Sequence, residues 1–422
     1  MGRPNSGVNM TGKICIIGAG PSGCFLAQAL LKSAPGLEVD VIDALPVPFG
    51  LVRYGVAADH QGTKAIARQF ARIFERQGAR FLGNICVGRD ITLTQLQAAY
   101  DVVVLAAGLS GDRRLGISGD TLSGVYGAGS LTRALNEHPD APPLPVLGPR
   151  PLIIGNGNVA LDILRLLAKT QAELEGSDLG PGPSQWLAQN RIDHLTIVGR
   201  AAPERAKFDT VMLKELAKLS DVTIQMNDIA PSATDADGEK LLQSLTGLDG
   251  KSDGPRQLIF RFGLTPLALT GDTHVRAAHF SNAAQQQVDI PCSSVITAIG
   301  FEAQNDWLPR DALIQSAADL SSGRLGPRLY AAGWFRRGPR GTIPEHRTDA
   351  QILARTILAD LDPDAGRAGR RALGQIKQVT DFDGWLRIDA AETQSPPTGR
   401  CRSKISSRLR MVQIAQQEGT RQ

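Results

Sequence analysis

Two glycine-rich turns constrain this sequence most strongly, because each lies between an apolar, β-branched run and a helical stretch. In the first unit, residues 13–18 (KICIIG) predict a buried parallel strand and residues 21–32 predict a helix. The turn between them has the pattern G-x-G-x-x-G, with Gly18, Gly20 and Gly23 at its fixed positions. The first glycine permits a tight turn, the second lets a pyrophosphate approach the backbone, and the third lets the helix pack on the strand.

A carboxylate follows the first turn at the spacing that ribose recognition needs. Residues 37–42 predict a second strand, and Asp43 stands at its end, twenty residues after Gly23. A carboxylate at this place can hold ribose hydroxyls. The glycine pattern alone also occurs in ordinary turns, so the prediction of a dinucleotide site depends on strand, turn, helix and acid together.

The second turn, residues 155–160 (GNGNVA), repeats the pattern between a strand at residues 151–155 and a helix at residues 159–169. Its second strand, residues 194–198, leads to Arg200 instead of an acid. A guanidinium at this place suits a 2′-phosphate, which favours NADP over NAD. The alternative is a solvated basic loop.

The order of the predicted strands indicates how the two units are arranged. A chain of 422 residues is long for one hydrophobic core, which favours two domains. Two late strands end on glycine, at residues 293–300 and 328–333, and the second lies where the chain can cross back to complete the first domain. We therefore expect an α/β fold of two Rossmann-like, three-layer domains, the second inserted into the first. Their expected limits are 13–110 and 325–422 (the latter with a C-terminal tail) for the discontinuous FAD domain and 111–324 for the NADP domain.

Composition excludes several classes of protein. The formal net charge of +4 argues against a dedicated nucleic-acid binder but allows an acidic protein partner. The first dozen residues are polar, so we expect neither a signal peptide nor a membrane span. The cysteines are too far apart for a metal site or a redox-active pair, which indicates a reducing compartment and favours the cytoplasm. They are Cys15, Cys24, Cys86, Cys292 and Cys401.

Two nucleotide sites in one chain, one with an acid and the other with an arginine, imply a division of roles. One nucleotide stays bound as FAD, and the other arrives as NADPH. The predicted reaction is hydride transfer from NADPH to the flavin.

Beyond these two turns, further sequence motifs resemble those of the adrenodoxin reductase-like ferredoxin–NADP reductases, and the resemblance extends from about residue 13 to about residue 407. The residues that carry this resemblance are 47–56 (VPFGLVRYGV), Asp59, His60, 83–84 (GN), 87–92 (VGRDIT), 155–162 (GNGNVALD), 333–343 (GWFRRGPRGTI) and 385–392 (WLRIDAAE).

The resemblance implies electron transfer from NADPH to FAD and then, singly, to a small acidic iron–sulfur protein of the ferredoxin type. It also implies that His60 and Asp162 lie near the flavin ring, where they support catalysis by hydrogen bonding and proton relay. A structural histidine and a helix-surface carboxylate are the alternatives. The implied FAD residues, with the turn glycines, are Gly18, Gly20, Ser22, Gly23, Asp43, Leu51, Val87, Trp334, Gly341, Thr342 and Ile343. The implied NADP residues are Gly155, Asn156, Gly157, Asn158, Val159, Arg200 and Gly341.

Three of these expectations have alternatives in ordinary packing. Trp334 covers the cofactor near the path of the nicotinamide, or it is a core residue. Leu51 and Val87 pack as core whether or not flavin touches them.

The sequence departs from the family pattern at three places. Ala201 stands where a second arginine usually follows Arg200, which weakens the preference for NADPH over NADH unless Arg205 or Lys207 substitutes. Met212 takes a position where a glutamate is common. Residues 344–348 (PEHRT) replace the usual small and polar residues after the Gly-Thr-Ile turn.

Several arginines are candidates for docking the acidic partner, namely Arg336, Arg337, Arg340, Arg347 and those of the basic tail 400–410. Solvated arginines are the alternative. Other possible functions are an electron-input subunit, a flavin monooxygenase and a non-catalytic redox-sensing module. The cysteine spacing argues against a disulfide reductase. The sequence leaves open the physiological acceptor, the direction of electron flow and the oligomeric state.

Overall fold

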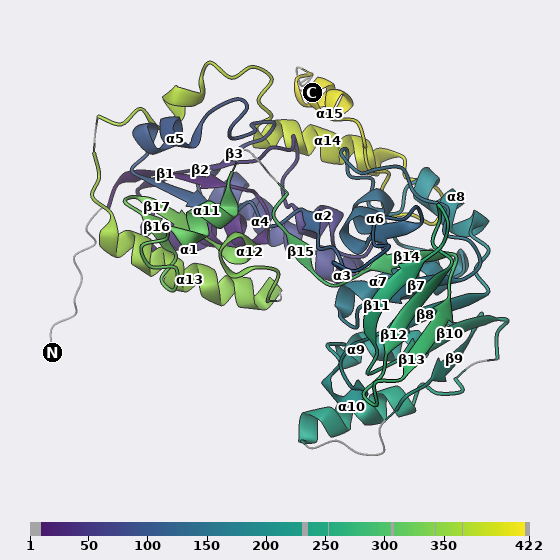
Figure 1. The fold of residues 1–422 in the computed structure, drawn as a ribbon. Coiled ribbons are helices and arrows are strands. Elements are labelled where there is room, and N and C mark those ends of the chain that lie inside the picture. The colour runs from purple at the N-terminus through teal and green to yellow at the C-terminus, as the bar shows by residue number, and fades with distance from the viewer. Residues whose placement is uncertain are drawn as a thin grey trace, which may run out of the picture.

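The structure is a computed structural model that describes residues 10–229, 235–251, 253–304, 308–341, 343–364 and 366–417. It has two lobes, each built around a six-stranded sheet with helices packed on it (Figure 1).

The first sheet has the strand order β16-β17-β4-β1-β2-β3. All its neighbouring strands are parallel except the edge strand β16, which is antiparallel to β17. The strands are β1 (Gly12–Ile17), β2 (Leu37–Ile42), β3 (Arg80–Leu82), β4 (Val102–Leu105), β16 (Arg324–Gly326) and β17 (Leu329–Ala331).

β1 shows why these residues form a central parallel strand. Ile14 and Ile16 pack in one hydrophobic cluster, whereas Cys15 and Ile17 pack in another on the opposite face. Side chains alternate between the two faces of a strand, so a strand covered on both faces must be apolar throughout. Helices α1 (Pro21–Ser33) and α13 (Ile343–Asp360) supply much of the first cluster.

The second sheet has the order β6-β14-β7-β8-β10-β9 and is parallel throughout. Its strands are β6 (Val125–Gly127), β7 (Pro151–Ile154), β8 (His194–Val198), β9 (Val222–Met226), β10 (Arg256–Arg261) and β14 (Ser294–Thr297). A three-stranded antiparallel sheet of β11 (Thr265–Thr270), β12 (Ala277–Ser281) and β13 (Gln287–Pro291) lies beside it.

The chain passes between the lobes twice, and the two passages pair with each other. β5 (Gly111–Asp112) leads from the first lobe to the second, β15 (Phe301–Glu302) leads back, and they form a short antiparallel ribbon. The expected α/β fold class, with one domain inserted into another, is confirmed. The domain limits expected at residues 110 and 324 stay predictions. Leu308 and Leu313, which precede the second of these limits, pack with the hydrophobic cluster of the first sheet.

The remaining helices cover the sheets and join the lobes. They are α2 (Leu51–Tyr54), α3 (Gln61–Lys64), α4 (Ile66–Arg76), α5 (Leu93–Ala99), α6 (Ala128–Leu135), α7 (Asn158–Ala168), α8 (Pro181–Gln189), α9 (Thr210–Leu216), α10 (Ala236–Thr246), α11 (Arg310–Gln315), α12 (Gly333–Arg337), α14 (Phe382–Gln394) and α15 (Arg408–Ala415).

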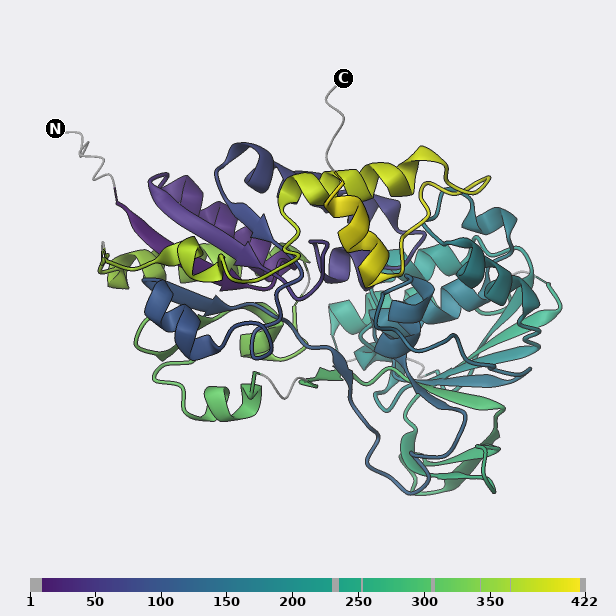
Figure 2. The ribbon, with the colours of Figure 1, turned by 90° about the horizontal axis from the view of Figure 1, so that it is seen from above.

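The C-terminal segment lies across both lobes (Figure 2). Trp385 and Met411 are buried in the first cluster, while Arg400 donates a hydrogen bond to the Leu174 carbonyl oxygen of the second lobe at 2.7 Å. Arg408 forms an ion pair with Asp140 in the loop after α6. The tail therefore fastens the two lobes together.

A half-buried histidine near this junction, His138, predicts acid sensitivity. The His138 ring meets the Tyr54 ring edge-on at 4.7 Å, and its Nδ1 accepts a hydrogen bond from the Asp140 amide at 3.0 Å. Burial lowers the pKa of His138 from 6.5 to about 4. The unfolded chain therefore takes up a proton between these pH values that the folded chain excludes, and stability present above pH 6.5 is lost as the pH falls toward 4.

We expect His138→Asn, which keeps an acceptor but does not titrate, to remove this part of the pH dependence. From its pKa shift, His138 should contribute roughly 3 kcal/mol to the loss of unfolding free energy between pH 7 and pH 4. Urea unfolding of both proteins at the two pH values measures the difference. Equal losses in the wild type and the variant would show that His138 is not the group responsible.

Candidate active site

The first glycine turn has the close backbone contacts that its pattern predicts. Gly18 has φ +113°, and a Cβ there would lie 2.5 Å from the Ala106 carbonyl oxygen. A Cβ on Gly23 would lie 2.0 Å from the Gly18 carbonyl oxygen. Gly20 is different, because a Cβ there would approach only the Gly50 Cα, at 3.9 Å. The outer glycines therefore serve packing, and the middle one leaves the backbone open.

The amides at the start of α1 are available to an anion. Gly20 is the N-cap residue of α1, and no side chain caps this end of the helix. Uncapped N–H groups at a helix N-terminus favour negative charge. This end of α1 can therefore hold a pyrophosphate.

Asp43 lies beside the first glycine turn and forms hydrogen bonds with its backbone. Its carboxylate accepts hydrogen bonds from the Ala19 amide at 2.8 Å and the Leu45 amide at 2.9 Å. Burial raises the pKa of Asp43, and the two amides oppose that rise. The acid fixes the shape of the turn, and its expected contact with ribose hydroxyls stays a prediction.

Leu51 and Val87 lie in different surroundings. Leu51 is half-buried and begins α2 directly after Gly50, which has φ +47° and would place a Cβ 3.0 Å from the Gly20 Cα. This puts Leu51 beside the glycine turn. Val87 is buried in the cluster on the other face of the first sheet, as expected of a core residue.

The second glycine turn opens into a large cleft. Gly155 has φ +136°, and a Cβ there would lie 2.2 Å from the Ala298 carbonyl oxygen, whereas a Cβ on Gly157 would meet no atom within 4 Å. The Nδ2 of Asn156 is buried without a hydrogen-bond partner. The cleft has a volume of about 1320 Å³ and contains most of the expected NADP residues. Those lining it are Gly155, Asn156, Gly157, Asn158, Val159 and Arg200.

The basic side chains beside this cleft divide into two kinds. Arg200 is exposed and lines the cleft, next to Ala201. Lys207 also lines it, and its backbone amide donates to the Asn156 carbonyl oxygen at 3.0 Å. Arg205 does not line the cleft and forms an ion pair with Asp235 at 2.9 Å. Of the two residues that could substitute for the missing arginine, Lys207 therefore lines the cleft and Arg205 does not.

Helix α12 brings residues of the first lobe to the same cleft. Trp334 is half-buried, lines the cleft and stacks on Phe301 at 5.4 Å between ring centroids. Its Nε1 is buried without a partner. A half-buried ring on the wall of a cleft, with an unsatisfied donor, fits a covering role better than a purely core one.

The segment after α12 carries the remaining expected FAD residues. Gly341 has φ +96°, and Ile343 begins α13, where its amide is free of the bonds within the helix. Thr342 lies outside the described residues. In the divergent stretch 344–348, His346 is buried and its Nδ1 lies 3.2 Å from the Ser22 Oγ, which joins this stretch to the first turn.

His60 is held between carboxylates from two helices of the second lobe. Its Nε2 lies 2.9 Å from Glu215 Oε2 on α9, and its Nδ1 lies 3.5 Å from Asp162 Oδ1 on α7. Burial raises the pKa of Asp162, while His60 and Arg165 oppose that rise. Asp162 is therefore an internal partner of His60 and not a surface carboxylate of the helix.

Glu215 was not expected to be a partner of His60. We expected Met212 to take the place of a glutamate common in the family, but the same helix presents Glu215 to His60 one turn later. The i, i+3 spacing of the two residues was the available signal. Behind this group, Arg165 is 1% exposed and is paired with Asp59, Asp162 and Glu215.

The arginines expected to dock a partner are only partly free. Arg336 is ion-paired with Asp349, and Arg337 Nη2 lies 3.1 Å from His346 Nδ1. Arg340 and Arg347 are exposed and have no side-chain partner in the part of the chain that the structure describes. In the basic tail, Arg400, Arg402, Lys404 and Arg408 all make internal hydrogen bonds or ion pairs.

Three further observations concern other kinds of site. No cluster of three or more His, Cys, Asp or Glu side chains in the described ranges is arranged to hold a metal ion. No helix in those ranges has both the length and the apolar character needed to span a bilayer. All five cysteines are unpaired.

Comparison with known proteins decides the family. The family profile described as pyridine nucleotide-disulphide oxidoreductase matches residues 12–333. The chain belongs to this family of oxidoreductases. It is 40% identical to cindoxin reductase of Citrobacter braakii, over 95% of this chain and 91% of that protein. It is 32% identical to the mitochondrial NADPH:adrenodoxin oxidoreductase of Arabidopsis thaliana, over 90% of each.

A solved structure agrees with this assignment. Mycobacterium tuberculosis FprA in complex with NADPH matches with a TM-score of 0.87 at 29% identity, over 96% of this chain and 100% of FprA. The resemblance to adrenodoxin reductase-like proteins is confirmed.

Proposed function

We propose that this oxidoreductase is an FAD-dependent ferredoxin/adrenodoxin-type NADP reductase. It takes hydride from NADPH and passes electrons singly to a small acidic carrier protein. The observation that carries this proposal is a single cleft walled by the second glycine turn of one lobe and by Trp334 of the other. A nucleotide bound at the second turn would therefore have its reactive end directed toward the first lobe.

The residues present fit both cofactors. The turn at Gly18, Gly20 and Gly23 leaves backbone open at an uncapped helix N-terminus, which suits the FAD pyrophosphate. The unsatisfied donors Asn156 Nδ2 and Trp334 Nε1 lie where a nucleotide would meet them. Residues 13–110 and 325–422 would form the FAD part and residues 111–324 the NADP part.

The chain's own residues have distinct tasks in this reaction. Bound FAD supplies an acceptor that takes two electrons together and gives them up one at a time. Arg200 and Lys207 would hold the 2′-phosphate and Trp334 would cover the reacting region, while His60, between Asp162 and Glu215, would hold or move a proton. Hydride transfer itself needs close, aligned reactants and not an acid or a base.

The acceptor and the location are further parts of the proposal. The names of the relatives mention cindoxin, adrenodoxin and ferredoxin, so the related proteins serve different carriers. Exposed Arg340, near the cleft, could meet an acidic one, and we favour an iron–sulfur protein. We also propose a cytoplasmic location, as the cysteine usage led us to expect.

Anaerobic stopped-flow reduction tests the proposal. We expect bound flavin to be bleached much faster by NADPH than by NADH and then reoxidised by a small acidic ferredoxin. An acidic flavin-containing carrier, added in parallel, tests the acceptor class. A flavin that neither nucleotide reduces would reject the enzyme assignment, and reoxidation only by the flavin-containing carrier would reject the iron–sulfur partner.

A further inference from the structure

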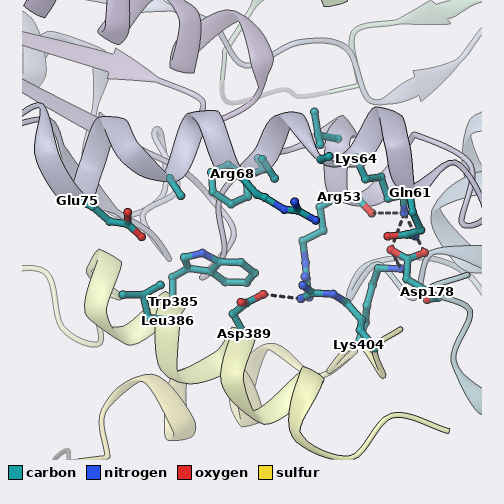
Figure 3. A pocket seen from close by; sticks show the side chains of 16 residues that line it. Arg53, Gln61, Lys64, Arg68, Glu75, Asp178, Trp385, Leu386, Asp389 and Lys404 are labelled. Carbon is teal, nitrogen blue, oxygen red and sulfur yellow. Dashed lines mark hydrogen bonds and ion pairs between the residues drawn. The ribbon is translucent and has the colours of Figure 1, made fainter. Parts of the chain in front are cut away.

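A second cavity, of about 310 Å³, lies between α4 and α14 of the first lobe and extends past α3 to Asp178 of the second lobe (Figure 3). None of its 16 lining residues belongs to the residues expected to bind FAD or NADP. The cavity is partly open to solvent, and its lining residue Leu386 is 40% exposed. Its size is at the lower end of the range for small-molecule sites.

Small residues facing aromatic ones create this space. Ala67 and Ala71 lie one turn apart on α4 and line the cavity, so at these two positions no large side chain fills it. Trp385 on α14 lines it from the other side and meets Phe49 edge-on at 5.7 Å. One part of the cavity is therefore apolar and aromatic.

The other part is cationic. Lys64 and Lys404 are both buried, and both contact the same carboxylate oxygen of Asp178, at 2.7 and 2.9 Å. Burial, followed by the nearby charge of Lys404, lowers the pKa of Lys64 to about 7. Two ammonium groups sharing one carboxylate leave a local shortage of negative charge.

The neighbouring charged groups remove only part of this shortage. Buried Arg53 pairs with Glu392 at 2.5 Å, and its Nε has no partner. Arg402 pairs with Asp389 at 2.6 Å and with Glu392 at 2.8 Å. Glu392 and Asp389 are thus already engaged by cations. Glu137, the other acid near Lys404, has a buried Oε2 without a hydrogen-bond partner, and burial raises its pKa to about 7. Glu75, at the far end of the α4 face, is exposed.

Arg68 adds a cation that is free. It lines the cavity, is exposed, and has no side-chain partner in the described part of the chain. Figure 3 shows its side chain reaching from α4 into the space between the two helices, on the side where Arg53 also lies. A free guanidinium beside an aromatic wall can bind a planar anion with two parallel hydrogen bonds.

We propose that this cavity binds a small organic anion, with its carboxylate or phosphate group at Arg68 and its apolar, ring-sized body against Trp385. The ammonium groups of Lys64 and Lys404 already donate to Asp178, Asn136 and backbone oxygens, so the lysines favour the anion through their charge and not through hydrogen bonds. An occupant would also contact Phe49 and Val52, which flank the Gly50-Leu51 step beside the first glycine turn. The proposal does not depend on the identity of the electron acceptor.

Calorimetric titration of the holoenzyme with benzoate and with phenyl phosphate tests the site and distinguishes the two anionic groups. Benzyl alcohol, which lacks the charge, and inorganic phosphate, which lacks the ring, are the control ligands. Saturating NADP⁺ is present throughout to occupy the large cleft. We expect saturable binding of at least one of the two ring anions and much weaker binding of both controls.

Two matched variants decide whether the binding is at this cavity. Arg68→Gln should lower the affinity for the anion about tenfold or more, as loss of a charge-assisted hydrogen bond implies. Arg72→Gln changes an exposed arginine one turn further along α4 that does not line the cavity, and it should bind as the wild type does. Absence of saturable binding by either anion, or equal affinity in Arg68→Gln and the wild type, would overturn the proposal. Because neither variant touches the dinucleotide residues, a failure here is distinct from a failure of the reductase assignment.

Discussion

Gly23→Ala is expected to yield a protein that has lost its bound flavin. Alanine is normally the better helix residue by about 1 kcal/mol, and Gly23 lies in α1. At this position, however, the new Cβ would lie 2.0 Å from the Gly18 carbonyl oxygen, so α1 and the turn must move apart. We expect a loss of roughly 2 kcal/mol or more in unfolding free energy together with loss of the cofactor.

The measurement is the ratio of visible flavin absorbance to protein absorbance after purification, with thermal unfolding in parallel. Gly182→Ala is the matched control, because Gly182 lies in the first turn of α8 and a Cβ there meets no atom within 4 Å. This control should retain flavin and full stability. Full flavin occupancy in Gly23→Ala would contradict the role assigned to the first turn.

Arg200→Gln is expected to reduce selectivity for NADPH without changing the chemical step. A guanidinium on a 2′-phosphate forms charge-assisted hydrogen bonds, and their loss should raise the KM for NADPH roughly tenfold to fiftyfold. The KM and kcat for NADH should stay the same, because NADH lacks that phosphate. kcat should be retained, since the contact is made equally in the ground state and the transition state.

Steady-state reduction of an artificial acceptor by both nucleotides measures this difference. Arg205→Gln is the control, because Arg205 is also exposed and close in sequence but pairs with Asp235 outside the cleft. Equal losses with NADPH and NADH in Arg200→Gln would show that the arginine does not read the 2′-phosphate. Lys207 would then be the next residue to replace.

Much of the fold could be predicted because its main signals are local. The strand expected at residues 194–198 coincides with β8, and the helix expected at residues 21–32 is α1 to within one residue. Apolar runs, glycine turns and helical stretches lie within short windows of sequence, so no knowledge of distant contacts is needed. The antiparallel edge strand β16 was not expected, since three residues give too little pattern.

The site was harder to predict because its contacts join distant segments. The pairing of Glu215 with His60, the stacking of Phe301 on Trp334, and the contact of His346 with Ser22 each depend on how separate elements pack. Sequence spacing carries no direct information on such distances. Arg205 and Lys207 were equivalent candidates in the sequence, and only the fold separates them.

The pairing of β17 with β4 affects how the first sheet forms during translation. β4 pairs with β17, so one side of β4 has no strand beside it until the ribosome has added about 225 further residues, a delay of roughly 10 to 45 s. During that time the nascent chain exposes an unpaired, apolar strand edge, while the whole sheet of the intervening lobe has already been synthesised. The N-terminal part of the molecule is thus the last to be completed, and its unpaired β4 edge is the place where a nascent-chain chaperone would be needed.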